Sequence, residues 1–227
     1  MFAKDISLVI FCKRPALGQG KQRLAASVGK PAALQVAEAL LDCVLEDAAR
    51  WPGPVVLSPA TELDADWAAE LGNRNYQVIP QSDGNLGNRI LAVDAQLRAQ
   101  GHRKLIYIGS DAPEHDQGLY DSLIAVMESH DVVLTPAADG GVTAMGTAVG
   151  WGALDALPWS TDQLGKALCQ QTEDAGLSVG FTIGCYDIDQ LADLQRIQET
   201  LRNDPRPARQ MLLRITDQLL EGHDGWR

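Results

Sequence analysis

Strand-like and helix-like segments alternate along the first 135 residues, and this alternation restricts the fold more than any other feature. The first segment, Ile6–Cys12, is an almost continuous apolar run, which is typical of a strand buried on both faces. Apolar residues then recur at helical spacing from residue 34 to residue 48. Further strands are expected at residues 54–58, 76–79, 104–109 and 131–135, and helices between them at residues 62–71, 86–100 and 118–129. Repeated strand–helix units predict an α/β three-layer sandwich, in which a mainly parallel sheet carries helices on both faces.

The pattern is less regular after residue 139. A strand is expected at residues 142–149, a helix at 160–175 with Ser160 as its cap, a strand at 178–186, and helices at 190–201 and 208–220. There is no internal repeat, low-complexity tract or long linker. We therefore expect a single domain over residues 1–227, with a C-terminal helical extension from about residue 204.

Composition excludes several classes of function. Nineteen Lys and Arg against 30 Asp and Glu give a net charge of −11, which argues against binding to nucleic acid or to anionic membranes. The sequence has neither an apolar run long enough to span a membrane nor the pattern of a signal peptide, so a cytoplasmic protein is expected. The four cysteines form no CxxC pair, and free thiols are expected rather than a zinc site.

The segment after the first strand is basic and rich in glycine. In parallel sheets, ligands bind beyond the carboxyl ends of the strands, where this segment lies. Its cations are Lys13, Arg14, Lys21 and Arg23, and its glycines are Gly18 and Gly20. Backbone amides and cationic side chains are suited to a phosphate, although a solvated surface loop is the alternative.

Two well-known phosphate loops do not fit this segment. A Walker A loop needs Gly five residues before the Gly-Lys pair and Ser or Thr after it, but Pro15 and Gln22 stand there. The dinucleotide fingerprint needs a third Gly where Arg23 stands. These mismatches weaken the hypothesis of a P-loop kinase.

Acidic residues follow several of the other strands. Asp111 after the fourth strand can hold Mg²⁺ or stabilise a turn, and Asp139 lies in an Asp-Gly pair that is also common in hairpins. Asp187 can complete a metal site while Asp189 caps the next helix. The loop at residues 81–89 opens a helix and can meet a base or a phosphate. His115 is either a general base or, in the simpler reading, a surface histidine.

Six motifs occur in an order that resembles a known family. They are KRPALGQGKQRL at residues 13–24, QSDGNLGNR at 81–89, GSDAP at 109–113, PAADGG at 136–141, WST at 159–161 and DIDQLADL at 187–194. Together they resemble the bacterial glycosyltransferase-like proteins of the GT-A, nucleotide-diphospho-sugar transferase superfamily. The branch they resemble is associated with radical-SAM and selenium-related proteins, and is related to the molybdenum-cofactor and phospholactate guanylyltransferases. The resemblance extends from about residue 6 to residue 200.

The resemblance implies a role for each motif. Asp111 and Asp187 would bind Mg²⁺ or Mn²⁺, and Asp111, Lys21 and Asp139 would be the catalytic residues. The implied nucleotide-binding residues are Lys13, Pro15, Gly18, Gly20, Lys21, Arg23, Gly87 and Arg89. The implied substrate-binding residues are Asp139, Gly140, Gly141, Trp159 and Ser160.

The expected activity is glycosyl or nucleotidyl transfer from a nucleotide or nucleotide-sugar donor to a small acceptor. Two residues depart from the family pattern: Gln22 stands where Thr is usual, and Val142 where an aromatic residue is usual. A catalytically degenerate nucleotide-binding or scaffold protein on the same fold is therefore the alternative. The base, the sugar, the acceptor and the oligomeric state stay open, and a homo-oligomer is compatible with the sequence.

Overall fold

The computed structural model describes residues 3–71 and 76–224 and contains a seven-stranded sheet. The strands are β1 (Ile6–Cys12), β2 (Val55–Pro59), β3 (Gln77–Val78), β4 (Lys104–Ile108), β5 (Val132–Pro136), β6 (Val142–Thr147) and β7 (Val179–Phe181). Their order is β3-β2-β1-β4-β6-β5-β7, and β6 alone among them is antiparallel to its neighbours. The carboxyl ends of the other six strands therefore lie at one edge of the sheet.

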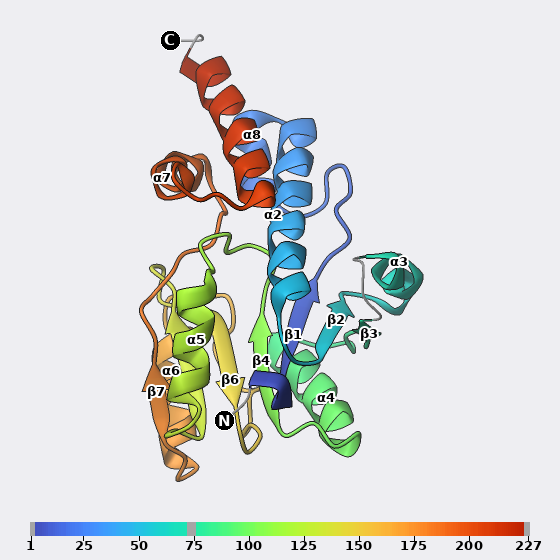
Figure 1. The fold of residues 1–227 in the computed structure, drawn as a ribbon, viewed down its shortest axis with the longest axis vertical. Helices are drawn as coiled ribbons and strands as arrows, with labels where there is room; N and C mark the ends of the chain where they lie inside the picture. The colour runs from blue at the N-terminus through green and yellow to red at the C-terminus, as the bar shows by residue number, and fades with distance from the viewer. Residues whose placement is uncertain (1–2, 72–75, 225–227) are drawn as a thin grey trace.

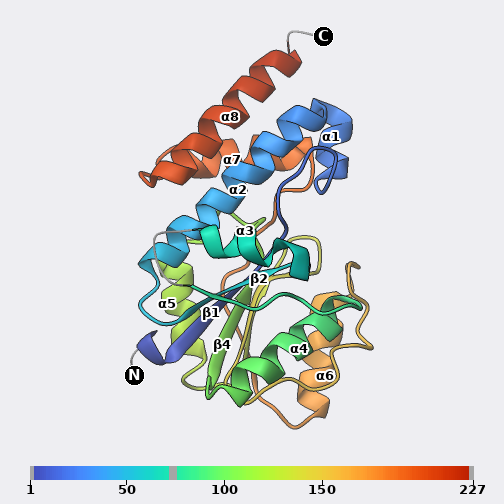
Figure 2. The ribbon, with the colours of Figure 1, turned by 90° about the vertical axis from the view of Figure 1, so that its right-hand side faces the viewer.

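Helices cover both faces of this sheet (Figures 1 and 2). The helices are α1 (Gln22–Val28), α2 (Lys30–Arg50), α3 (Ala65–Glu70), α4 (Leu86–Ala99), α5 (Gln117–Val126), α6 (Leu164–Asp174), α7 (Leu191–Leu201) and α8 (Pro207–Asp224), with short 3₁₀ turns at Ala3–Asp5 and Glu62–Asp64, and α2 to α6 are those that pack on the sheet. Leu8 and Ile10 of β1 belong to a core with α2, α3 and α5, whereas Val9 belongs to a second core with α4 and α6. This confirms the predicted three-layer α/β sandwich.

A third core lies beyond the carboxyl edge of the sheet. It joins α1, the first half of α2, α7 and α8, and includes Leu24, Leu40, Ile188, Leu194 and Leu212. Helix α8 lies along α2 in both views (Figures 1 and 2). The C-terminal helices thus form a wall above the strand ends.

Several local expectations need correction. The basic loop ends at Lys21, after which the additional helix α1 begins, which was not expected. Helix α6 begins at Leu164 rather than residue 160, because Ser160 has a φ of 63° and does not cap it. The strand expected at residues 178–186 is confined to Val179–Phe181. Within the described residues, no helix is long and apolar enough to cross a membrane. The four cysteines are free, with Cys12 and Cys43 buried and Cys169 and Cys185 partly exposed.

Candidate functional site

The loops after β1, β4 and β7 meet at the carboxyl edge of the sheet. Because β1 and β4 are paired in parallel, the loop that starts at Lys13 lies beside the loop that contains Asp111. The segment after β7 is attached to the same place, since the amide of Ile188 donates to the carbonyl of Asp111 over 2.9 Å. Asp187 and Asp189 are the sequence neighbours of Ile188, so this bond holds both of them near the backbone of Asp111.

A cavity of about 540 Å³ opens between these loops. Five of the expected nucleotide-binding residues line it, namely Lys13, Pro15, Gly20, Lys21 and Arg89, together with Asp111 and Ser160. Arg14, Gln19, Gln81, Asn85, Ser110 and Asp189 also line it, although only the loops that contain them were expected at the site. The cavity therefore combines four cations with one expected metal ligand.

Lys21 lies at the centre of this arrangement. Its side chain is only 7% exposed, and its ammonium group lies 2.9 Å from Oδ1 of Asp111 and 3.6 Å from Oδ1 of Asp189. The ammonium also donates to the carbonyl of Ile188. Lys21 is thus buried between acids instead of solvated, and it holds the loops after β1, β4 and β7 together.

Lys21 and Ser160 have left-handed backbones, with φ of 45° and 63°. They are the only non-glycine residues with positive φ in the described part of the chain, and both line the 540 Å³ cavity. Such a conformation costs a residue with a side chain about 1–3 kcal/mol, and it persists where the surrounding contacts impose it.

The loop at residues 81–89 forms another wall of the cavity. Gln81 is fixed by a bond of 2.7 Å from its side chain to the carbonyl of Ser58, and Arg89 donates to the carbonyl of Gly84 over 2.9 Å. Asn85 caps α4 by accepting from the amide of Asn88 over 3.0 Å. The positive end of the 14-residue helix α4 therefore faces the cavity, which favours an anion there.

Asp111 and Asp187 both line a second, smaller cavity of about 190 Å³, which adjoins the first. Burial raises the pKa of Asp187, the nearby carboxylates of Asp189 and Asp139 raise it further, and Lys21 opposes them. The described residues contain no group of three or more His, Cys, Asp or Glu side chains arranged for a metal. Two carboxylates nevertheless fit Mg²⁺ or Mn²⁺, because such ions fill their coordination shell with water and substrate phosphates.

Six of the expected site residues line neither cavity: Gly18, Arg23, Gly87, Asp139, Gly140 and Gly141. Arg23 is 74% exposed and lies 3.8 Å from Asp189. Asp139 accepts from the amide of Gly141 over 3.0 Å, in a turn beside β6.

Gly87 and Gly140 permit close packing. A Cβ on Gly87 would lie 2.2 Å from the carbonyl oxygen of Leu154, and one on Gly140 would lie 2.1 Å from that of Asp162. The proposed cap at Asp189 is also wrong. Gln190 occupies the cap position of α7, and the side chain of Asp193 accepts from the amides of Asp189 and Gln190.

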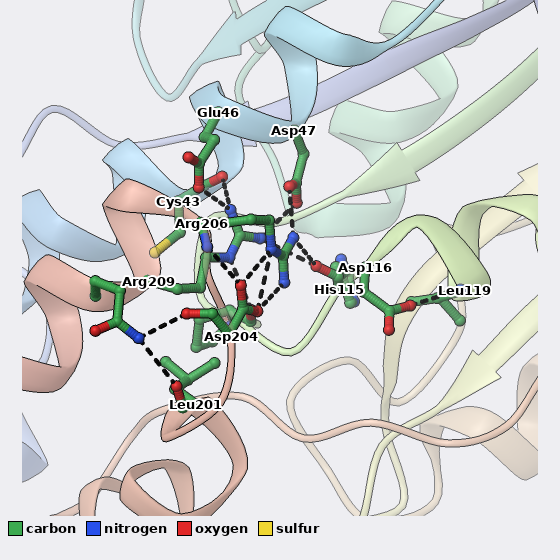
Figure 3. A network of polar contacts seen from close by, with 12 residues as sticks. Cys43, Glu46, Asp47, His115, Asp116, Leu119, Leu201, Asp204, Arg206 and Arg209 are labelled. Atoms are coloured by element: carbon green, nitrogen blue, oxygen red, sulfur yellow. Dashed lines mark hydrogen bonds and ion pairs between the residues drawn. The ribbon is translucent and has the colours of Figure 1, made fainter.

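Two arginines behind the site were not expected to contribute to it. Arg209 of α8 is fully buried, lies 2.6 Å from Oδ2 of Asp47, and donates to the carbonyl of His115 over 3.0 Å (Figure 3). It also donates to the carbonyl of Pro113 over 3.1 Å. Arg206 donates to the same carbonyl of His115 over 2.8 Å and to Asp47 over 2.9 Å. This arginine pair holds the chain immediately after Asp111. The helical spacing of Arg209 with the buried Leu212 and Thr216 is the sequence signal that could have revealed it.

Another cavity, of about 610 Å³, lies between the end of α2, α5 and the segment that joins α7 to α8, and it shares no lining residue with the other two. Its lining contains four aspartates, and its cations Arg50 and Arg206 are already paired with Glu46 and with Asp47 and Asp204. An acidic lining disfavours phosphate, so this cavity is less suited to an anion than the 540 Å³ cavity.

His115 is neither a surface histidine nor a candidate base. It is buried beneath the arginine pair with its ring edge-on to Tyr120, and its Nε2 has no partner among the described residues. Burial, followed by the charges of Arg209 and Arg206, lowers its pKa from 6.5 to about 3. His115 is therefore neutral in the folded protein near neutral pH.

This burial predicts a pH dependence of stability. Because the folded pKa lies below the unfolded value, the unfolded chain takes up a proton first as the pH falls. The contribution of neutral His115 to the free energy of unfolding is fully present above about pH 6.5. It falls by about 1.4 kcal/mol per pH unit as the pH is lowered towards 3. We expect His115→Phe to remove this slope. Urea unfolding of both proteins between pH 7.5 and pH 4.5 measures it, and parallel stability curves would refute the assignment.

Comparison with known proteins gives one family match and several structural neighbours. The family described as "Uncharacterized protein conserved in bacteria (DUF2064)" matches residues 43–161, more than half of the chain. No curated protein sequence gives a significant match.

Many solved structures share the fold, and three of them serve as examples. The first is from Desulfovibrio desulfuricans G20, with a provisional assignment as a nucleotide-diphospho-sugar transferase; it is 22% identical, has a TM-score of 0.87, and the match covers 97% of this chain and 98% of that one. A 4-diphosphocytidyl-2C-methyl-D-erythritol synthase from Anaerococcus prevotii is 15% identical, with a TM-score of 0.55 and coverage of 89% and 100%. A nucleotidyl transferase from Methanothermobacter is 18% identical, with a TM-score of 0.54 and coverage of 88% and 99%. At these identities the likeness establishes the nucleotide-diphospho-sugar transferase fold.

Proposed function

The chain belongs to the DUF2064 family, and we propose that it is a metal-dependent transferase that uses a nucleotide or nucleotide-sugar donor and a small acceptor. One observation carries the proposal: the 540 Å³ cavity joins the basic loop, the N-terminal end of α4 and Asp111 at the carboxyl edge of the sheet. This is the place where open α/β sheets bind their ligands. The transferases that share the fold are consistent with it.

In the proposed complex, the donor's phosphates lie against Lys13, Arg14 and Arg89 and the amides at the start of α4. Charge-assisted donors of this kind bind phosphate oxygens strongly. Asp111 and Asp187 would hold Mg²⁺ or Mn²⁺, which neutralises charge on the leaving phosphates when bound. Lys21 holds Asp111 and the segment after β7 in register, so that the carboxylates keep their places before the donor arrives.

Two reactions fit this site. In glycosyl transfer, an acceptor oxygen bonds to the anomeric carbon of a nucleotide-sugar, and the bond from that carbon to the nucleoside diphosphate breaks. In nucleotidyl transfer, an acceptor oxygen bonds to the α-phosphorus of a nucleoside triphosphate, and pyrophosphate leaves. Neither needs a covalent enzyme intermediate, and positioning with electrostatic stabilisation supplies the catalysis.

A thermal-shift screen tests the proposal. Nucleoside triphosphates and nucleotide-sugars are added with Mg²⁺, with Mn²⁺ or with a chelator, because a ligand that binds only the folded state raises the Tm. At least one nucleotide should raise the Tm more with metal than with chelator. The absence of such a nucleotide would refute the proposal. Metal-dependent binding without turnover of any donor would instead favour the degenerate scaffold, to which Gln22 and Val142 point.

The basic loop supplies a more specific prediction. Lys13→Ala should weaken nucleotide binding about ten- to hundredfold, since a lost charge-assisted contact costs about 1.5–3 kcal/mol. Arg23→Ala is the matched control, because Arg23 is in the same region but does not line the cavity. Calorimetric titration with the nucleotide found in the thermal-shift screen compares the affinities of wild type, Lys13→Ala and Arg23→Ala. Equal affinities for wild type and Lys13→Ala would reassign the loop as a surface turn.

A further inference from the structure

The 190 Å³ cavity beside Asp111 differs in character from the larger one. Its walls include Phe11, Ile90, Val142, Met145, Trp159 and Leu164, and we call this space the apolar chamber. It shares Phe11, Leu86, Gly109 and Asp111 with the 540 Å³ cavity. A molecule in the apolar chamber therefore lies next to the phosphates of a donor in the larger cavity.

The size of the apolar chamber limits what it can hold. An apolar cavity of about 150 Å³ accepts a molecule of the size of benzene. The apolar chamber, at about 190 Å³, accepts a body slightly larger than that. Hydrophobic and aromatic walls stabilise an apolar body and offer few partners for the hydroxyl groups of a hexose.

The charges around the apolar chamber exclude an anion. Among the described residues that line it, only Asp111 and Asp187 are charged, whereas the cations Lys13, Arg14 and Arg89 line the larger cavity. A phosphate in the apolar chamber would lose its hydration and face two carboxylates. A dication held by both aspartates would be engaged with the donor's phosphates, and no lysine or arginine among the described residues lines the apolar chamber to bind a second phosphate.

One polar group in the apolar chamber is available to a ligand. Thr143 is one of its lining residues, and the hydroxyl of Thr143 is buried and has no hydrogen-bond partner among the described residues. A buried hydroxyl without a partner costs free energy, which a ligand hydroxyl recovers by bonding to it. The apolar chamber thus offers apolar contact for the body of a molecule and one hydrogen bond for its hydroxyl.

We propose that the apolar chamber binds the acceptor, and that this acceptor is a compact, apolar-bodied alcohol without a phosphate or carboxylate group. The assignment rests on the proposed transferase function and narrows it to transfer onto a hydroxyl. The hydroxyl oxygen forms the new bond to the donor, the donor's bond to its leaving phosphate breaks, and the leaving phosphate takes the hydroxyl proton. An acceptor phosphate, which nucleotidyl transfer to a sugar phosphate would require, does not fit.

Benzyl alcohol and benzyl phosphate test the charge argument, because they share one body and differ in the end group. Their binding to the full chain is measured by saturation-transfer NMR titration, without donor or metal. We expect benzyl alcohol to bind wild type. It should bind Val142→Phe at least tenfold more weakly, because the new ring fills the apolar chamber. The control variant Val149→Phe should bind it like wild type. Val149 is exposed and does not line the apolar chamber. Benzyl phosphate should bind only in the larger cavity, so its binding should persist in Val142→Phe and weaken in Lys13→Ala.

Thr143→Val supplies a second test that does not change the volume of the apolar chamber. It should lower the affinity for benzyl alcohol severalfold and leave the affinity for toluene unchanged. The proposal is overturned if benzyl alcohol does not bind wild type, if its binding is the same in Val142→Phe, or if benzyl phosphate loses its binding in that variant as the alcohol does. Because no donor or metal is present, these results are independent of whether the thermal-shift screen supports the transferase function.

Discussion

Asp111→Asn is expected to lower the affinity for a metal–nucleotide complex by on the order of a hundredfold. Asn keeps the size of the side chain and one acceptor oxygen but loses the negative charge that a hard dication requires. Calorimetric titration with nucleotide, with and without Mg²⁺, measures the change. Without Mg²⁺ the variant should bind nucleotide at least as well as wild type, because one acid has left a cavity lined by cations.

The control for this prediction is Asp155→Asn, an exposed acid that lines neither cavity. It should bind as wild type does in both conditions. If Asp111 only stabilises its loop, Asp111→Asn will instead keep its Mg²⁺-dependent affinity for nucleotide. It will then lose roughly 1 kcal/mol of stability, because a hydrogen bond within the loop is lost. That result would remove Asp111 from the site.

Arg209→Met should destabilise the fold by about 3–5 kcal/mol, because it leaves the buried carboxylate of Asp47 with one cation fewer and removes the arginine donor from the carbonyls of Pro113 and Cys43. Burial already raises the pKa of Asp47, and Arg209 is the main group that opposes this. Urea unfolding near neutral pH measures the loss. Arg214→Met in the same helix is the control, since Arg214 is exposed and should change stability by no more than about 0.5 kcal/mol.

A double variant shows whether the effect is electrostatic. Adding Asp47→Asn to Arg209→Met removes the uncompensated charge and should recover part of the lost stability. If the double variant is less stable than Arg209→Met alone, the cavity left by the guanidinium explains the loss better than the charge does.

The sequence predicted the layers of the fold and the loops at the strand ends, because both follow from local patterns. The apolar run Ile6–Cys12 and the strand-like segments that follow it in the sequence indicate a parallel sheet. A parallel sheet brings the carboxyl ends of its strands to one edge. Which residues of those loops face a cavity depends on tertiary contacts that the sequence does not display. Gly87 and Gly140 belong to promising motifs, yet their missing Cβ atoms make room for the carbonyls of Leu154 and Asp162.

Buried polar residues were the least predictable. His115 is polar and lies in a loop, so a surface position was the natural interpretation, but two arginines more than 90 positions downstream cover it. Lys21 was expected to meet phosphate directly, and its ion pair with Asp111 depends on a left-handed backbone that an isolated sequence does not reveal.

The contacts of Arg209 also bear on the order in which the chain acquires its structure. Arg209 and its partner Asp47 are separated by 162 residues, and α8 leaves the ribosome after every element that it binds. Closing so long a loop costs entropy that only the final contacts offset. The strands can pair during synthesis, whereas the segment after Asp111 lacks its arginine donors until α8 is complete. A nascent chain that stops short of α8 therefore has its sheet before it has a finished site.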